Sequence, residues 1–328
     1  MSTAKGQPVH EILFSCLDPD EDAPIVVDAG ARSGMFDLPP SYASRAQLVA
    51  FEPNPAEFQK LNESDPGSRG APPRFRSERY VDSALWDDET ERTLYITAGR
   101  GATTMMGHAD RDIVDKIYRE GEPRSFYEMA LRHVRTTQIK ARRLDGLFDP
   151  NDTVDYLKID VEGAELRVLR GADGLLSRGK VLLVRSEFVV VPYYEAHPLL
   201  GDQHAFLDDH GFRLIAIELG HPGYSRGPTR IPRSQDRRLV TSGDAVFIVD
   251  PDKTSLDPVS AHRLGVVSIA LGFSSLGVSL LRDAELLESR TIDEIETVLS
   301  RVPLRRRAAS RWHAFPQLIG RVSARLKR

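Results

Sequence analysis

The chain has 328 residues, of which 41% are hydrophobic and 28% are charged, and its formal net charge is −4 at pH 7. These values are ordinary for a soluble globular protein and leave room for one large domain with an appendage. The single cysteine, Cys16, excludes an internal disulfide framework and is typical of a reducing compartment. The chain has neither the apolar core of a signal peptide near its start nor an apolar run of about 18 residues, so we expect a cytoplasmic protein without a spanning helix.

The first predicted strand, Ile25–Val27, is followed by the pattern Asp28-x-Gly30-x-x-x-Gly34. Glycines directly after a strand let a ligand approach the backbone, and the start of the next helix offers free N–H groups. The spacing differs from the Gly-x-Gly-x-x-Gly of dinucleotide-binding proteins, because Arg32 occupies the place of the second glycine. The motif therefore disfavours a dinucleotide, and a plain tight turn is the alternative to a cofactor site.

The second predicted strand, Gln47–Phe51, ends at Glu52. An acid at this point can accept hydrogen bonds from both hydroxyls of a ribose. The third predicted strand, Tyr80–Leu85, carries three residues that could lie along an adenine ring: Asp82, Ser83 and Ala84. We predict that Glu52 and these three residues bind the nucleoside part of a cofactor; solvated residues at strand ends are the alternative.

Residues 99–137 form a long insert, and a connection of that length is more often a lid or binding element than filler. Thr103 and Thr104 in this insert are candidate substrate contacts. Further strands are predicted at Val154–Ile159, Val181–Val184, Phe212–Ile217 and Ala245–Val249, with helical patterns between several of them. This alternation predicts βαβ units and a parallel sheet, into which the last strand inserts antiparallel because no obvious helix precedes it.

The strand Val154–Ile159 runs directly into Asp160-Val161-Glu162-Gly163-Ala164-Glu165. A buried strand that ends in carboxylates delivers them to the carboxyl edge of a parallel sheet, where open α/β folds keep their ligands. Glu187 follows the next predicted strand. The sequence therefore indicates a cofactor of the nucleotide type with a group of acids beside it.

Together these segments resemble the FkbM family of S-adenosylmethionine-dependent methyltransferases over about residues 24–250. The most specific part is the block Leu157-Lys158-Ile159-Asp160-Val161-Glu162-Gly163-Ala164-Glu165 with Leu169-Arg170-Gly171-Ala172 behind it. Shorter matching segments are Val27–Ala31, Phe51–Pro53, Arg143–Asp145, Glu187, Pro192–Tyr194, Gly211–Phe212 and Asp244–Phe247. The chain departs from the family pattern at Arg32, where a small polar residue is usual, and at Pro39-Pro40, which interrupts the first helix.

The resemblance implies an α/β class I methyltransferase fold, a Rossmann-like sheet of seven mostly parallel strands with helices on both faces. It implies O-methylation of a hydroxyl on a sugar, a glycan or a glycosylated natural product. The implied cofactor is S-adenosylmethionine, and the residues assigned to it are Asp28, Gly30, Arg32, Gly34, Glu52, Asp82, Ser83, Ala84 and Asp160.

Methyl transfer to a hydroxyl requires alignment, exclusion of water and an acceptor for the proton. Asp160 is the first candidate for this base because it lies at the strand end nearest the expected methyl group. Glu162 and Glu187 share that role or bind a divalent metal ion with it. Glu165 is interpreted as a first-turn helix residue and Lys158 as an ion-pair partner beneath the site. A predicted substrate wall follows Glu187 and consists of Tyr193, Tyr194 and His197.

After Pro251 the chain has helical patterns, at His262–Leu287 and Ile292–Leu299, and no strand pattern. We therefore divide it into an N-terminal segment (1–23), a methyltransferase domain (24–250) and a helical extension (251–328). From Arg301 onward it carries eight arginines, one lysine and no acid. This tail predicts a basic amphipathic helix that lies on an anionic membrane; a helix packed on the acidic body of the protein and a disordered end are the alternatives. The acidic body argues against a nucleic-acid partner.

Two other functions stay open. A nicotinamide-dependent oxidoreductase would share the sheet, but the missing Gly-x-Gly-x-x-Gly argues against it. A non-catalytic cofactor-binding module is the second alternative, and the joint presence of Asp28, Glu52, Asp160 and Glu187 argues against such a degenerate protein.

Overall fold

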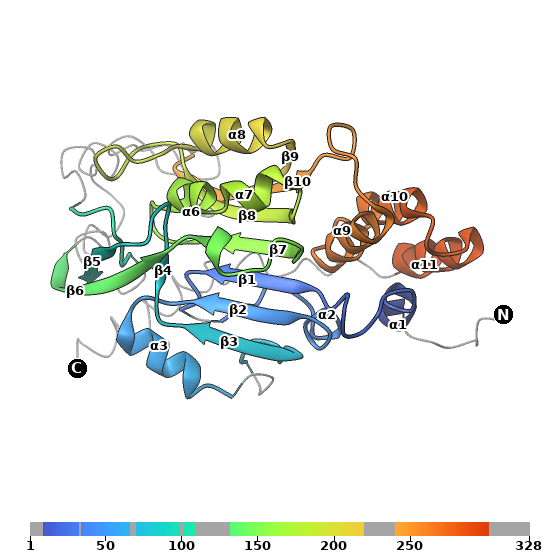
Figure 1. The fold of residues 1–328 in the computed structure, drawn as a ribbon, viewed down its shortest axis with the longest axis horizontal. Coiled ribbons are helices and arrows are strands. Elements are labelled where there is room, and N and C mark those ends of the chain that lie inside the picture. The colour runs from blue at the N-terminus through green and yellow to red at the C-terminus, as the bar shows by residue number, and fades with distance from the viewer. Residues whose placement is uncertain are drawn as a thin grey trace, which may run out of the picture.

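A computed structural model describes residues 9–32, 34–65, 70–98, 102–108, 132–219 and 240–301. They form a main sheet of seven strands, a second sheet of three strands, and helices around them (Figure 1). The predicted basic tail and most of the predicted insert lie outside these residues. Among the described helices, none combines the length and the apolar character that crossing a membrane requires.

The main sheet has the strand order β3-β2-β1-β7-β8-β10-β9. Its strands are β1 (Ile25–Ala29), β2 (Gln47–Phe51), β3 (Ser77–Val81), β7 (Val154–Ile159), β8 (Val181–Val189), β9 (Phe212–Leu219) and β10 (Ser242–Val249). Neighbours pair in parallel except at β10, which runs antiparallel to both β8 and β9. This is the predicted class I methyltransferase arrangement. The strand order reverses between β1 and β7, and open α/β sheets bind ligands at the carboxyl edge of such a switch point.

The second sheet, with the order β4-β6-β5, was not predicted. The single strand predicted over Tyr80–Leu85 is wrong, because β3 ends at Val81 and the chain crosses to β4 (Ala84–Leu85) in the other sheet. β5 (Glu91–Thr97) pairs antiparallel with β6 (His133–Arg142), whose first residues belong to the predicted insert 99–137. Most side chains of β6 are exposed, so the strand lacks the apolar run on which sequence prediction depends.

The helices α3 (Pro55–Asn62) and α8 (Leu200–Asp209) lie between strands, where the sequence predicts helical patterns. Between β7 and β8 the chain forms two helices, α6 (Glu165–Gly171) and α7 (Asp173–Ser177), and α6–α8 lie over the sheet in Figure 1. The pattern over residues 262–287 likewise divides, at Gly272, whose φ is +96°. Its helices are α9 (Pro258–Ala270) and α10 (Ser274–Ala284), and α11 (Ser289–Arg301) follows. The shorter helices are α1 (Val9–Leu13), α2 (Pro40–Ala43) and a 3₁₀ turn at Leu144–Gly146.

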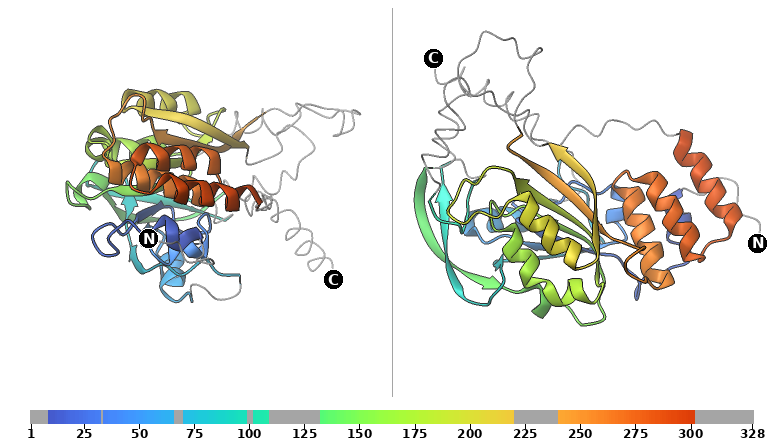
Figure 2. Two further views of the ribbon diagram at one scale, coloured as in Figure 1. Left: turned by 90° about the vertical axis from the view of Figure 1, so that its right-hand side faces the viewer. Right: turned by 90° about the horizontal axis from the view of Figure 1, so that it is seen from above.

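The helices α9, α10 and α11 stack side by side at one end of the main sheet (Figure 2). Apolar residues of all three belong to the same buried cluster as β1, β7 and β8: Leu264, Val267, Leu281, Ile292 and Ile295. A buried ion pair adds a polar link, since Arg263 Nη2 lies 2.6 Å from Asp155 Oδ2 in β7. The same carboxylate accepts the N–H of Ile25 at the start of β1. The C-terminal helices therefore hold the amino-terminal edge of the sheet.

Candidate active site

Backbone hydrogen bonds hold the carboxyl ends of the central strands level with one another. Gly30 N donates to Phe51 O at 3.1 Å, and Asp160 N donates to Ala29 O at 3.0 Å. The N–H of Glu52 likewise bonds to the end of β3. The glycine turn, Glu52 and Asp160 therefore lie along one edge of the sheet.

The two predicted glycines have structural reasons to be glycines. Gly30 has a φ of +90°, and a Cβ there would lie 1.9 Å from the carbonyl oxygen of Asp160. Gly34 has a φ of +80°, and a Cβ there would lie 2.7 Å from the side chain of Pro72. Only glycine allows β1 to leave the sheet so close to the end of β7.

Asp28 lies beneath this edge, in an ion pair. Its side chain is 1% exposed, and Lys158 Nζ lies 3.3 Å from Asp28 Oδ1 and 3.4 Å from Asp160 Oδ2. Burial raises the pKa of Asp28, although the charge of Lys158 opposes this. Burial disfavours the charge of Lys158, but the carboxylates of Asp28 and Asp160 outweigh it and raise the pKa of the lysine. Lys158 is thus the ion-pair partner that the sequence predicts.

Two of the residues predicted to bind a nucleoside are buried and carry polar groups that a ligand could use. Glu52 is 6% exposed, its Oε1 accepts the N–H of Asn54 at 2.8 Å, and burial raises its pKa to about 7. Ser83 is 1% exposed, and its hydroxyl has no hydrogen-bond partner among the described residues. A buried hydroxyl of this kind gains a partner when a polar ligand binds beside it. These two residues fit a nucleoside cofactor.

The other predicted cofactor residues lie in different surroundings. The Nε of Arg32 lies 3.7 Å from Glu57 Oε2, so its charge faces the helix α3. Asp82 is exposed, and Ala84 is buried at the start of β4. Asp82 and Ser83 therefore follow the carboxyl end of β3, where the chain crosses to the second sheet, and Ala84 already belongs to that sheet.

Three carboxylates converge at the ends of β7 and β8. One oxygen each of Asp160, Glu162 and Glu187 lies within 4.8 Å of the others, and we call these residues the acid cluster. Burial raises the pKa values of Glu162 and Glu187, and the negative charges of the neighbouring acids add to the rise. Such a group can accept a proton, and its oxygen ligands also suit a hard divalent cation.

Glu165 caps the turn that carries Glu162. Its Oε1 accepts hydrogen bonds from Val161 N and Gly163 N, both at 3.1 Å. Burial raises the pKa of Glu165 to about 7 although these N–H groups favour its charged form. The residue interpreted from sequence as a first-turn acid of a helix thus bonds to the backbone on both sides of Glu162.

The predicted substrate residues lie against the same turn. Tyr194 and His197 are buried, and a Cβ on Gly163 would lie 3.1 Å from Tyr194 Cδ2 and from His197 Nε2. His197 Nδ1 accepts the N–H of Tyr193 at 3.1 Å, which assigns the ring proton to Nε2. Burial lowers the pKa of His197 to about 4, so the ring is neutral at pH 7.

The two threonines of the insert also approach this turn. Thr104 is 1% exposed, and its hydroxyl donates to the carbonyl oxygen of Glu162 at 2.7 Å. Thr103 is partly buried beside it. The hydroxyl of Thr104, a predicted substrate contact, therefore donates its hydrogen bond to the protein backbone.

Sequence reasoning missed a charged network on the same face of the sheet. Arg185 in β8 lies 3.3 Å from Asp37 Oδ2 and 3.0 Å from Asp244 Oδ2, and the hydroxyl of Tyr156 donates to Asp37 Oδ2 at 2.6 Å. Asp244 is the cross-strand partner of Glu187. A charged residue inside the apolar strand Val181–Val189 is the signal that could have indicated this network. It connects the loop after the glycine turn to the strand that carries Glu187.

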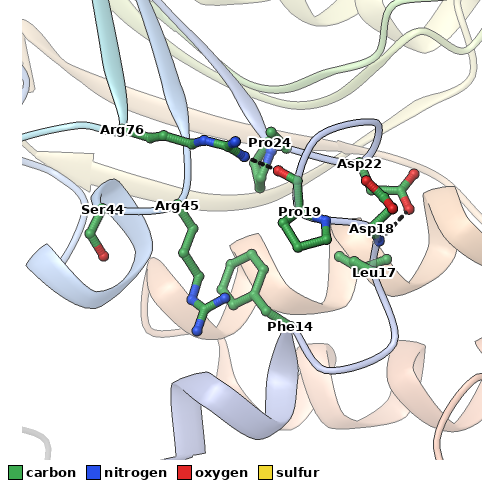
Figure 3. A pocket seen from close by; sticks show the side chains of 10 residues that line it. Phe14, Leu17, Asp18, Pro19, Asp22, Pro24, Ser44, Arg45 and Arg76 are labelled. Atoms are coloured by element: carbon green, nitrogen blue, oxygen red, sulfur yellow. Dashed lines mark hydrogen bonds between the residues drawn. The ribbon is translucent and has the colours of Figure 1, made fainter.

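A pocket of about 380 Å³ lies at the opposite, amino-terminal edge of the sheet (Figure 3). Its polar side chains are engaged within the protein: Arg76 bonds to the carbonyl oxygen of Pro19, and the guanidinium of Arg45 lies 5.1 Å from the ring centre of Phe14. Open α/β sheets bind ligands at their carboxyl edge. The acid cluster, at the carboxyl edge, is therefore the candidate centre for chemistry.

Comparisons with known proteins agree with this geometry. The family described as the methyltransferase FkbM domain matches residues 28–214, a range that contains Asp28, Glu52 and the acid cluster. Methyltransferase sdnD of Sordaria araneosa is 28% identical over 233 residues, which cover 65% of this chain and 85% of that protein. Methyltransferase 1 of Beauveria bassiana (strain ARSEF 2860) is 27% identical over 176 residues, which cover 50% of this chain and 66% of that protein.

Among solved structures, magnesium protoporphyrin IX methyltransferase from Synechocystis PCC 6803, with bound SAM, aligns with a TM-score of 0.31 and 9% identity. The alignment covers 73% of this chain and 77% of that chain. The strand order of the main sheet is what identifies the fold of this chain.

Proposed function

The chain belongs to the FkbM family of S-adenosylmethionine-dependent methyltransferases, and we propose that it methylates a hydroxyl of a small polyhydroxylated acceptor: a sugar, a glycan or a glycosylated natural product. The observation that carries this proposal is the acid cluster, Asp160, Glu162 and Glu187, at the sheet edge that also holds the glycine turn. A hydroxyl becomes a useful nucleophile only when a group beside it accepts its proton.

When bound, S-adenosylmethionine supplies an electrophilic methyl group on a sulfonium. We assign its ribose to Glu52, whose carboxylate accepts hydrogen bonds from vicinal hydroxyls, and we assign a polar nucleoside contact to the unpaired hydroxyl of Ser83. Gly30, whose N–H bonds to the end of β2 at this edge, would place its backbone beside the rest of the cofactor. Asp28 and Lys158 hold this edge from beneath.

The acid cluster provides the proton acceptor for the acceptor hydroxyl. During methyl transfer, a carboxylate oxygen of the cluster would accept the proton that the acceptor hydroxyl gives up. Tyr194 and the neutral His197 lie beside the cluster and form the wall that excludes water from the acceptor. Neutral, hydroxyl-rich acceptors suit this site, since a phosphate or carboxylate would be repelled by the acids.

A second role of the acid cluster is to hold a divalent cation that orients the acceptor hydroxyl. The spacing of its oxygens, within 4.8 Å of one another, favours this alternative. Activity measured after dialysis against EDTA and again after addition of Mg²⁺ distinguishes the two roles. Loss and recovery of activity indicate the cation, and unchanged activity indicates that the carboxylates act alone.

Calorimetric titration with S-adenosylhomocysteine and with NAD⁺ tests the cofactor. We expect binding of the first ligand alone, weakened by about tenfold or more in Glu52→Ala, because the ribose loses its charged hydrogen-bond acceptor. Binding of NAD⁺ instead would indicate the oxidoreductase alternative. Heat from neither ligand would overturn the proposal.

Transfer of a radiolabelled methyl group tests the acceptor. We expect labelling within a panel of neutral sugars, glycosides and polyols, and no labelling of phosphorylated sugars or of a short RNA. Cofactor binding without transfer to any member would indicate a non-catalytic binding module, and labelling of the RNA would contradict the predicted absence of a nucleic-acid partner.

A further inference from the structure

The turn after β7 holds Glu162 in a conformation that its residue type disfavours. The φ angles of Glu162 and Gly163 are +57° and +105°, both in the left-handed region. A residue with a Cβ is crowded there against the following carbonyl oxygen, so it persists only where its surroundings fix it. The direction in which the Glu162 carboxylate points therefore depends on the groups that hold this turn.

Two side chains hold the backbone of the turn from opposite directions. The hydroxyl of Thr104 donates to the carbonyl oxygen of Glu162 at 2.7 Å. The carboxylate of Glu165 accepts the N–H groups on either side of Glu162, those of Val161 and Gly163. Glu165 is a neighbour in sequence, but Thr104 comes from 58 residues away, where it lies beside β5 of the second sheet's hairpin.

Thr104 is itself anchored to that hairpin. Its N–H and C=O both pair with Tyr95 of β5, at 3.2 and 2.9 Å. Its hydroxyl oxygen also accepts the N–H of Met106 at 3.0 Å, so both the donor and an acceptor site of the hydroxyl are occupied. The side chain of Met106 packs on the turn, where a Cβ on Gly163 would lie 3.1 Å from Met106 Cγ. Strand β5, residues 104–106 and the turn after β7 thus form one continuous contact.

We propose that Thr104 is a positioning residue for methyl transfer, which fixes the left-handed turn and thereby aims the carboxylate of Glu162 at Asp160 and Glu187. The chemistry of the acid cluster rests on the proposed function, whereas the positioning rests on the contacts described here. In this role the hydroxyl of Thr104 serves the protein backbone and does not contact the acceptor.

The test compares Thr104→Val, which removes the hydroxyl at nearly constant shape, with Thr104→Ser, which retains it. A matched control is Thr93→Val, because Thr93 is on the same hairpin and its hydroxyl accepts a hydrogen bond from Gln138 at an exposed position. Three quantities are measured in each variant: the affinity for S-adenosylhomocysteine, kcat on the best acceptor of the neutral panel, and amide hydrogen exchange in the peptide that spans residues 160–166.

In Thr104→Val we expect kcat to fall by about tenfold to a hundredfold while the affinity for S-adenosylhomocysteine stays within about twofold, because a small displacement of a reacting group affects the transfer step. Amide exchange at residues 161–163 should accelerate. Thr104→Ser and Thr93→Val should match the unsubstituted protein in all three measurements. If Thr104→Val does not fold, Thr104→Ala removes the same hydroxyl without added bulk.

Three results would overturn the positioning role: an unchanged kcat in Thr104→Val, an equal loss in Thr104→Ser, or a parallel loss of cofactor affinity. The amide exchange measurement needs no acceptor, so it tests the positioning role even if no member of the acceptor panel is methylated. In that case the proposed function fails, while faster exchange in Thr104→Val alone still supports the positioning of the turn.

Discussion

Glu52 is assigned to bind a ribose as a charged carboxylate, but burial disfavours that charge in the protein without its cofactor. Its carboxylate is buried, which raises its pKa to about 7 from an ordinary value of 4.5. The folded state therefore binds the proton more tightly than the unfolded state does. The stability that this group contributes is complete below about pH 4.5 and is lost as the pH rises through about 7.

We expect Glu52→Gln to stabilise the cofactor-free protein at pH 8 and to leave its stability nearly unchanged at pH 4.5. The change that the substitution causes in the free energy of unfolding should be about 3 kcal/mol larger at pH 8 than at pH 4.5, since each unit of pKa shift corresponds to about 1.4 kcal/mol. Urea denaturation at both pH values measures it. An equal effect at pH 4.5 and pH 8 would show that the carboxylate is not buried as described.

Lys158 is the cation that two carboxylates share, at 3.3 and 3.4 Å from Asp28 and Asp160. Lys158→Met should destabilise the protein by about 3–5 kcal/mol, because it leaves the fully buried Asp28 without a counter-charge. The double variant Asp28→Asn, Lys158→Met removes both charges and should recover most of that loss. Denaturation of the single and double variants measures the coupling, and additive losses would contradict a shared ion pair.

At the scale of elements, close approach between helices depends on glycines. A Cβ on Gly277 in α10 would lie 2.6 Å from the carbonyl oxygen of Gly265 in α9 and 2.5 Å from Ile269 Cγ1. We expect Gly277→Ala to lower the free energy of unfolding by about 1–3 kcal/mol, because the added methyl group must push the two helices apart.

The matched control is Gly201→Ala in α8, where an added Cβ has no neighbour within 4 Å. There the substitution should raise stability by about 0.5–1 kcal/mol, since alanine loses less backbone entropy than glycine in a helix. Thermal unfolding of both variants measures the two shifts. Equal effects would indicate that α9 and α10 do not touch at Gly265.

How far the sequence predicts the elements depends on where their apolar residues lie. β2 and β7 were predicted with their observed bounds because nearly all of their side chains are buried. β6 was missed because its exposed side chains dominate its pattern. Asp160 and Glu162 follow the end of β7, and Glu187 lies near the carboxyl end of β8, so their convergence could be predicted from the order of the strands, and it is found.

The contacts that hold the cluster could not be predicted in the same way. Thr104 reaches Glu162 from 58 residues away, and its hydroxyl bonds to a carbonyl oxygen that any residue would offer. Arg185 and Asp37 are likewise brought together only by the path of the loop over the sheet. Local sequence patterns report strand ends and helix faces, and they contain no information on such pairings.

At the scale of the whole molecule, the predicted boundary near Pro251 raises the question of whether the domain folds without the helices α9–α11. The sequence predicts a methyltransferase domain over residues 24–250 and a separate helical extension after it. The family match ends at residue 214, and α9–α11 contribute apolar residues to the cluster that contains β1, β7 and β8. The ion pair of Arg263 with Asp155 also lies inside this contact. We therefore propose that α9–α11 complete the core of the domain.

A chain that ends at residue 250 should fail to fold cooperatively. It would expose the apolar residues against which α9 packs and leave the buried carboxylate of Asp155 without its arginine, each a large loss of stability. Calorimetric unfolding of the full chain and the shortened chain, with S-adenosylhomocysteine binding as a second readout, decides the matter. A shortened chain with a sharp transition and unchanged ligand affinity would mean that the domain is complete without α9–α11. In that case, Arg263→Met in the full chain should cost little stability, whereas the core role that we propose requires a loss of about 3–5 kcal/mol.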